Sequence, residues 1–102
     1  MVLPASIIVA YFASWSIYSR SFFVNDIPGD KITHINYAFA NIGSDGDIIL
    51  GDSWADTDKA FDQDTWNQPL RGNFNQLKKL KEKYSHLQTL ISIGGWVNHI
   101  FI

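Results

Sequence analysis

The sequence of 102 residues contains no cysteine, so disulfide bonds, thiolate nucleophiles and cysteine-ligated zinc sites are excluded. Its formal net charge of −2 provides no positive field that would attract a polyanion. No apolar stretch reaches the length that a membrane-spanning helix needs. We therefore expect neither a nucleic acid nor a membrane as a partner. The length allows one small domain with its own core.

The sequence offers little to bind a metal ion or to mark a targeting segment. Its three histidines, His34, His86 and His99, lack the spacing that brings two imidazoles to one helix face. We expect them to cap, to pack or to lie in loops. The apolar start of the chain has no basic residue and contains Pro4, so it does not predict a signal peptide. We expect no metal and no cofactor.

Three apolar runs predict β-strands. Residues 7–13 form a continuous, partly β-branched run of the kind that is buried on both faces of a parallel sheet. The second run covers residues 35–40 and the third covers residues 87–93. In the second run, alternation predicts one face made of Ile35, Tyr37 and Phe39, and an opposite face made of Asn36, Ala38 and Ala40.

The clearest helix is predicted between the second and third runs, at about residues 73–84. Asn73 is suited to cap this helix, and Gln76 stands three residues later, as in a capping box. An apolar stripe at helical spacing is formed by Phe74, Leu77, Leu80 and Tyr84. Four lysines occupy much of the remaining surface, and we interpret them as a solvated face: Lys78, Lys79, Lys81 and Lys83. Between the first two runs we expect only one turn of helix, near residues 21–24.

Residues 42–67 predict a long irregular connection. They contain seven aspartates against one lysine, Lys59, which suggests a calcium site. However, the spacing of an EF-hand loop with its final glutamate is missing, so we interpret the segment as a solvated acidic loop. A connection of this length also indicates a functional loop beside a binding face.

The alternation of strands and helices is typical of a parallel α/β fold with right-handed crossovers. It does not distinguish an open doubly wound sheet from part of a barrel. No Gly-x-Gly-x-x-Gly motif follows the first strand, which disfavours a dinucleotide site. The third strand ends in Gly94-Gly95-Trp96, where the absence of Cβ atoms lets a ligand approach the backbone beside a flat indole.

Three separated motifs resemble those of the chitinases of glycoside hydrolase family 18, of the fungal and bacterial type. They are Tyr11-Phe12-Ala13-Ser14-Trp15, the segment from Thr33 to Asn41, and Ser92-Ile93-Gly94-Gly95-Trp96. The acidic segment from Asp52 to Asp56 is also similar. The resemblance implies an α/β fold in which residues 1–102 supply the first three β/α units of a (β/α)₈ TIM barrel, a fold of about 250 residues.

The resemblance also implies a set of substrate-binding residues. In that family the aromatic residues matching Tyr11, Phe39 and Trp96 line the sugar cleft, and Gly94 and Gly95 precede the last of them. Such residues stand at the carboxyl ends of parallel strands, where the active sites of barrels lie. The alternative is that Tyr11 and Phe39 belong to the barrel core and that Trp96 has a packing role.

The acid motif of the family, Asp-x-x-Asp-x-Asp-x-Glu on strand four, does not occur in these residues, and the only glutamate, Glu82, lies on the lysine-rich helix. The resemblance therefore implies a segment of a chitinase that hydrolyses β-1,4-N-acetylglucosamine linkages. This segment contributes residues that bind chitin or its oligosaccharides but contains no catalytic residue, and it needs the rest of the barrel for folding. An extracellular location is expected on the same ground.

Two other functions are considered. One is a non-catalytic, lectin-like member of the same superfamily that binds chitin, which glutamine or leucine in place of the strand-four glutamate would indicate. The other is a free-standing α/β interaction domain.

Overall fold

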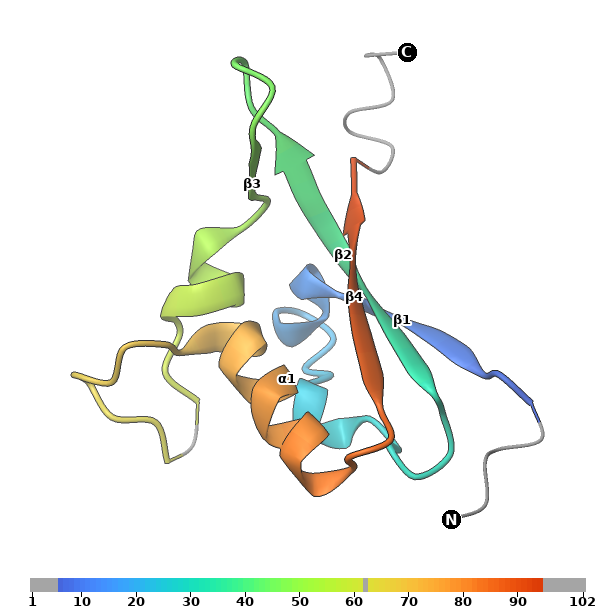
Figure 1. Cartoon of the computed structure of the whole chain (residues 1–102). Coiled ribbons are helices and arrows are strands. Elements are labelled where there is room, and N and C mark those ends of the chain that lie inside the picture. The colour runs from blue at the N-terminus through green and yellow to red at the C-terminus, as the bar shows by residue number, and fades with distance from the viewer. Residues whose placement is uncertain (1–5, 62, 95–102) are drawn as a thin grey trace.

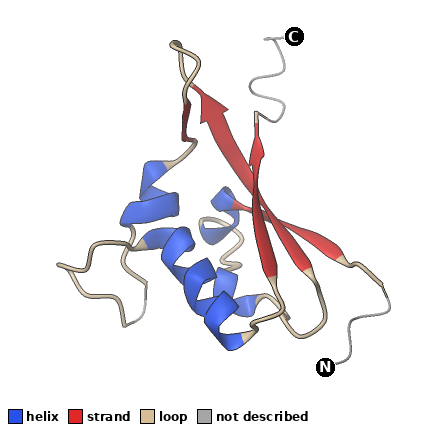
Figure 2. Cartoon of the chain, viewed as in Figure 1, coloured by secondary structure: helices blue, strands red, loops and turns tan. Residues whose placement is uncertain are grey.

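The computed structural model describes residues 6–61 and 63–94 of the chain. Four strands form one sheet: β1 (Val9–Ala13), β2 (His34–Ile42), β3 (Ile48–Leu50) and β4 (Gln88–Ile93). The helical segments are the short 3₁₀ turns η1 (Ser14–Ile17) and η2 (Val24–Asp26), the π-helical turn η3 (Trp54–Asp58) and the α-helix α1 (Gly72–Lys83). All of them gather on one side of the sheet and, within the described residues, leave its other face bare (Figures 1 and 2).

The sheet is mixed, with β2 at its centre. β1 and β4 pair in parallel with opposite edges of β2, as the α/β prediction requires. β3 is antiparallel to the end of β2, and Ala40 pairs with both Leu50 of β3 and Ile93 of β4. The prediction of parallel strands alone is therefore wrong for β3, which forms a short hairpin beyond the end of β1.

The predicted alternation along β2 holds only for its first half. Ile35 and Tyr37 are 1% and 2% exposed and lie in the core. The pairing of β2 with β4 then shifts register between Ala38 and Ala40, and the Ala38–Phe39 peptide bond is cis. Because a register shift reverses the faces that follow it, Phe39 leaves the core side and Ala40 is buried instead. The grouping of Phe39 with Ile35 and Tyr37 is thus wrong.

Helix α1 confirms the predicted helix to within one residue at each end. Its stripe packs on the sheet: Leu77 and Leu80 are buried, and Phe74 meets Tyr37 edge to face at 5.2 Å between ring centres. The predicted cap is wrong, since the N-cap residue is Arg71 and no side chain caps the helix. Asn73 is fully buried and points into the core instead.

The sheet is covered on one face only within the described residues. Phe12, Ile35 and Tyr37 contact the helical layer, whereas Val9 is 49% and Leu90 is 49% exposed. The prediction that the first strand is buried on both faces is therefore wrong here. No helix among the described residues is long and apolar enough to cross a membrane.

The acidic connection is more ordered than predicted. It contains β3 and η3, and η3 packs against the start of α1. Gly72, the first residue of α1, has a φ of +73° and lies so close to η3 that a Cβ would come within 2.5 Å of the Asp56 carbonyl. Asp56 is 1% exposed, so its assignment to a solvated loop is also wrong.

Candidate functional site

Tyr11 is the most exposed of the predicted substrate-binding residues that the structure describes. It projects from β1 with 70% of its surface exposed. In the register of the sheet, Tyr11 stands opposite Asn36 of β2, which stands opposite Leu90 of β4. These three residues form one row across the bare face of the sheet. The ring of Tyr11 therefore lies exposed on that face within the described part of the chain.

Phe39 lies on β2, beyond the residue that pairs with the last residue of β1, and its ring contacts Trp15 of η1. The ring centres are 5.9 Å apart and the planes are inclined by 33°. Trp15 is 48% exposed, so the pair forms an accessible aromatic surface at this end of the sheet. Trp15 is the last residue of the first of the three motifs and was not predicted as a substrate-binding residue. Its position four residues after Tyr11, just past the strand, was the available signal.

Gly94 follows the end of β4 and lies beside the same part of β2. Its backbone amide donates a hydrogen bond to the Ala40 carbonyl at 2.9 Å, and its φ of +96° is a conformation that favours glycine. The structure thus brings Gly94 next to the residue that follows Phe39. Gly95 and Trp96, the other two predicted substrate-binding residues, lie outside the described residues.

A buried polar network supports this end of the sheet from the helical side. The Tyr37 hydroxyl donates a short hydrogen bond to Asp56 Oδ1 of η3, and Asn73 Nδ2 of α1 donates to the same hydroxyl at 3.0 Å. The network joins β2, η3 and α1 through side chains that are 2% exposed or less. Sequence reasoning missed it because its three members are far apart in the chain.

Burial sets the protonation behaviour of this network. It raises the pKa of Asp56, and the hydrogen bond from Tyr37 opposes part of that shift. Burial also raises the pKa of Tyr37 far above its usual range, and the hydrogen bond to Asp56 adds to the effect. The network therefore favours a neutral phenol that donates to Asp56.

A second, exposed link joins the residue after η1 to Asp52, two residues before η3. The Tyr18 hydroxyl donates to Asp52 Oδ2 at 2.6 Å, and this hydrogen bond, followed by burial, raises the pKa of Tyr18 to about 12. Asp52 Oδ1 also accepts a hydrogen bond from the Ala55 amide at 3.2 Å. Asp52 thus holds the first turn of η3 and ties it to η1.

These carboxylates are structural groups. Asp56 is 1% exposed, and Asp52 accepts hydrogen bonds from the Tyr18 hydroxyl and from the Ala55 amide. The described residues also contain no group of three or more histidine, aspartate or glutamate side chains that could hold a metal ion. What this arrangement offers chemically is an aromatic surface with glycine backbone beside it.

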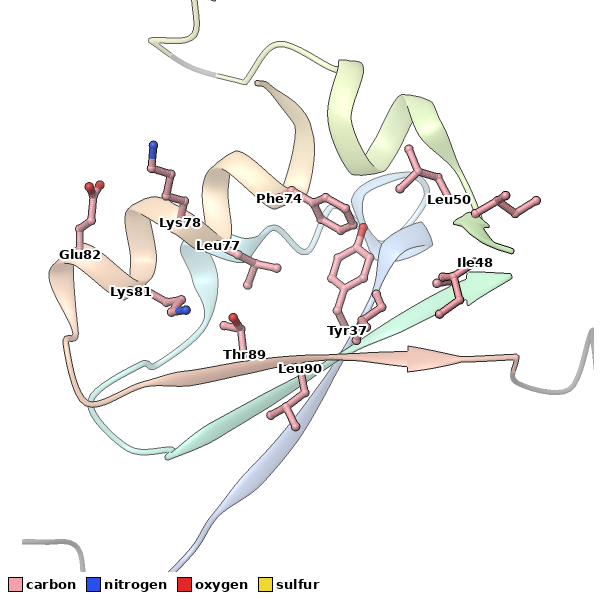
Figure 3. Close-up of a pocket in the computed structure, with 13 residues that line it drawn as sticks. Tyr37, Ile48, Leu50, Phe74, Leu77, Lys78, Lys81, Glu82, Thr89 and Leu90 are labelled. Atoms are coloured by element: carbon pink, nitrogen blue, oxygen red, sulfur yellow. The ribbon is translucent and has the colours of Figure 1, made fainter. Parts of the chain in front are cut away.

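An apolar groove of about 980 Å³ lies elsewhere, between α1, β3 and β4. Figure 3 shows Phe74 and Tyr37 facing each other, with Leu77 and Thr89 pointing toward the space between α1 and β4. Lys78, Lys81 and Glu82 of α1 also line it. Of the predicted substrate-binding residues that the structure describes, none lines this groove. The groove is therefore separate from the candidate site.

Comparison with known proteins gives a consistent result. The model of the family "Glycosyl hydrolases family 18" matches residues 7–101. Chitinase C of Streptomyces lividans is 50% identical over 104 residues, which cover 90% of this chain and 17% of the relative. Chitinase A1 of Niallia circulans is 43% identical, with 87% of this chain and 17% of the relative covered. The chain thus spans less than a fifth of the length of these relatives.

Solved structures agree. The catalytic domain of the psychrophilic chitinase B from Arthrobacter TAD20 superposes with a TM-score of 0.85 at 35% identity. The superposition covers 90% of this chain and 28% of the chain in that solved structure. Chitinases of this family are TIM barrels, so the β1, β2 and β4 arrangement is the kind of β/α structure from which such a barrel is built.

Proposed function

The chain belongs to glycosyl hydrolase family 18, and we propose that it supplies part of the sugar-binding cleft of a chitinase. In this proposal β1, β2 and β4 are the first three strands of the barrel, and residues 1–102 form the N-terminal part of the catalytic domain. The observation that carries the proposal is the exposure of Tyr11 on the bare face of the sheet.

The proposed ligands are chitin and oligosaccharides of N-acetylglucosamine. Tyr11 and the Phe39–Trp15 pair offer flat apolar surfaces to sugar rings, while Gly94 lets the ligand approach the backbone. We assign the same role to Gly95 and Trp96. Covering about 100 Å² of one aromatic ring contributes at most roughly 2.5 kcal/mol, at about 25 cal/mol per Å².

The acid that cleaves the glycosidic bond is proposed to come from outside these residues. General acid catalysis requires a carboxylic acid within hydrogen-bond reach of the leaving oxygen. Neither Asp52 nor Asp56 is free to take that role. A non-catalytic lectin is not favoured, since the two relatives and the solved structure named above are all chitinases.

The remainder of the barrel is the proposed partner of the exposed surfaces. The edge of β4 and the groove beside it expose apolar side chains, and Leu90, Ile91 and Ile93 are each 44% exposed or more. In a right-handed β/α succession, the helix after β4 packs on the same side of the sheet as α1. That helix is therefore expected to cover the groove. An extracellular location of the whole protein is part of the same proposal.

The test is a titration with soluble chitin oligosaccharides, followed by amide chemical shifts, of a complete, catalytically inactivated family 18 barrel in which residues 7–101 replace the homologous segment. We expect saturable shifts at Tyr11, Phe39 and Gly94, with affinity about tenfold lower in Tyr11→Ala, because 1.4 kcal/mol corresponds to a factor of ten. The matched control is Val9→Ala, which removes a 49% exposed side chain from the same face of the same strand.

Equal affinities of the wild type and Tyr11→Ala would assign Tyr11 to the barrel core. Equal losses in Tyr11→Ala and Val9→Ala would indicate a general effect on the sheet and would also contradict the proposal.

A further inference from the structure

A second cavity, of about 600 Å³, opens in the helical layer between η2, α1 and residues 59–61 and 63. Its apolar part is formed by Phe23 and Phe61, whose rings meet edge to face at 6.0 Å, together with Leu80. Helix α1, which lines this cavity, lies on the helical side of the sheet (Figure 1), opposite the bare face. The cavity is therefore separate from the proposed sugar cleft.

The charged side chains that line this cavity are mostly cationic. Lys59, Lys79 and Lys83 contribute three ammonium groups, against the single carboxylate of Asp26. That carboxylate already accepts a hydrogen bond from the Phe23 amide at 2.9 Å. The cavity thus has an excess of positive charge beside aromatic surface.

Two of the three ammonium groups have no carboxylate partner among residues 6–61 and 63–94. Lys79 pairs with Asp64 at 3.3 Å, and this is the only ion pair within the described part of the chain. Lys59 lies 5.3 Å from the centre of the Phe61 ring, and Lys83 lies 5.3 Å from that of Tyr84. Lys59 and Lys83 are therefore available to an external anion.

A buried hydrogen-bond donor also belongs to this cavity. Gln76 lines it from α1, on the same helical face as Lys79, Leu80 and Lys83. The side-chain nitrogen Nε2 of Gln76 is buried and has no hydrogen-bond partner. Buried donors are nearly always paired, so an unpaired one beside a cavity indicates that a ligand can accept its hydrogen bond.

We propose that this cavity binds a small organic anion that carries a ring. The ring contacts Phe23, Phe61 and Leu80, an anionic oxygen accepts the hydrogen bond of Gln76 Nε2, and Lys59 and Lys83 neutralise the charge. The ligand needs both the ring and the negative charge. Exposed ammonium groups bind an anion without a ring weakly, because water and salt screen the charges. A neutral ring lacks the charge and leaves the amide donor of Gln76 without an anionic acceptor.

The first test is a titration of the 102-residue chain with phenylphosphonate, with benzyl alcohol and with inorganic phosphate, followed by amide chemical shifts. We expect saturable shifts around residues 59–61 and 76–83 with phenylphosphonate only, and weaker binding at higher salt. Lys83→Gln is expected to weaken binding about threefold to fivefold. The matched control is Lys81→Gln, which removes the same charge from the same helix. Lys81 lines the groove between α1, β3 and β4 and not this cavity.

Gln76→Leu separates a ligand-binding role from a structural one. It is expected to weaken phenylphosphonate binding about tenfold, since a hydrogen bond to a charged group is lost. It is not expected to lower the urea midpoint of the free chain, because Gln76 Nε2 makes no hydrogen bond there. A lowered midpoint with unchanged binding would overturn the proposal.

A second measurement does not depend on the association state of the chain. Acetylation of each lysine is quantified by mass spectrometry with and without phenylphosphonate. We expect protection of Lys59 and Lys83, with Lys78 and Lys81 as internal controls on the other side of α1. Equal reactivity of all four lysines, equal weakening by Lys81→Gln and Lys83→Gln, or inorganic phosphate binding as tightly as phenylphosphonate would each overturn the proposal.

Discussion

Replacing Tyr37 with phenylalanine tests the buried network with the loss of a single oxygen. The substitution keeps the ring, which lies 5.9 Å from the ring of Phe12 and 5.2 Å from that of Phe74. It leaves Asp56 Oδ1 without the hydroxyl that donates to it and Asn73 Nδ2 without an acceptor. Two groups that are 1% exposed or less thereby lose a hydrogen bond.

The expected cost follows from the burial of these groups. An unpaired buried polar group costs about 1 to 3 kcal/mol, and a charged one costs more. Tyr37→Phe is therefore expected to lower the free energy of unfolding by about 3 to 5 kcal/mol at neutral pH. This is a large part of the stability of a small domain, which is about 5 to 15 kcal/mol.

The cost is expected to depend on pH. Burial raises the folded-state pKa of Asp56, so the stability linked to this group is present below its unfolded pKa and is lost as the pH rises through the folded value. The hydrogen bond from Tyr37 lowers that pKa. Its removal raises the pKa further, so the substitution should cost less at about pH 4 than at neutral pH.

The assay is urea denaturation at one fixed protein concentration, with the wild type, Tyr37→Phe, Asp56→Asn and the double variant. An amide oxygen at position 56 still accepts from Tyr37 and carries no charge, so Asp56→Asn is expected to be the milder single change at neutral pH. A loss for Tyr37→Phe within about 0.5 kcal/mol of zero, as for an ordinary surface change, would refute the reasoning. An equal loss of unfolding free energy at pH 4 and at neutral pH would refute the argument that the cost depends on the ionisation of Asp56.

Gly72→Ala is expected to destabilise the chain by about 1 to 3 kcal/mol, because residue 72 has a positive φ and its Cβ would meet the backbone of η3. Urea denaturation compares it with Gly46→Ala, which shares the positive φ but has open space, and equal losses would contradict the steric part. Tyr18→Phe is expected to remove an ionisation near pH 12 from an ultraviolet titration, because the hydrogen bond to Asp52 raises the pKa of Tyr18 to about 12. The stability linked to the neutral phenol is present below about pH 10 and is lost as the pH rises through about 12. Loss of an ionisation near pH 10 instead would count against the bond to Asp52. The 102-residue chain is expected to self-associate through its exposed sheet edge and bare face, and size-exclusion chromatography showing a compact monomer would contradict this.

The elements with strong local patterns were predictable from the sequence. The apolar runs predicted the ends of β1, β2 and β4 to within about two residues, and the apolar stripe through Leu77 and Leu80 predicted α1. The alternation along β2 failed at Phe39, because a register shift against β4 reverses the faces. Such a shift depends on the neighbouring strand, so no local period predicts it.

The acidic connection could not be predicted for a related reason. β3 has only three residues, and its stability comes from pairing with the extension of β2. Asp56 is buried because Tyr37, 19 residues earlier in the chain, donates to it. Asn73 fits the cap pattern by type, yet its amide is used by the same network. At each of these positions, tertiary contacts rather than local sequence propensity determine the structure.

The most direct test of the central claim is a segment exchange. Residues 7–101 replace the homologous segment of Chitinase C from Streptomyces lividans, to which the chain is 50% identical, and release of a fluorophore from a chitobioside is measured. We predict that the chimaera hydrolyses the substrate, that Tyr11→Ala in the chimaera raises KM, and that the 102-residue chain alone releases no fluorophore. A folded chimaera without activity, or an activity that Tyr11→Ala leaves unchanged, would contradict the claim that this segment forms part of a chitinase cleft.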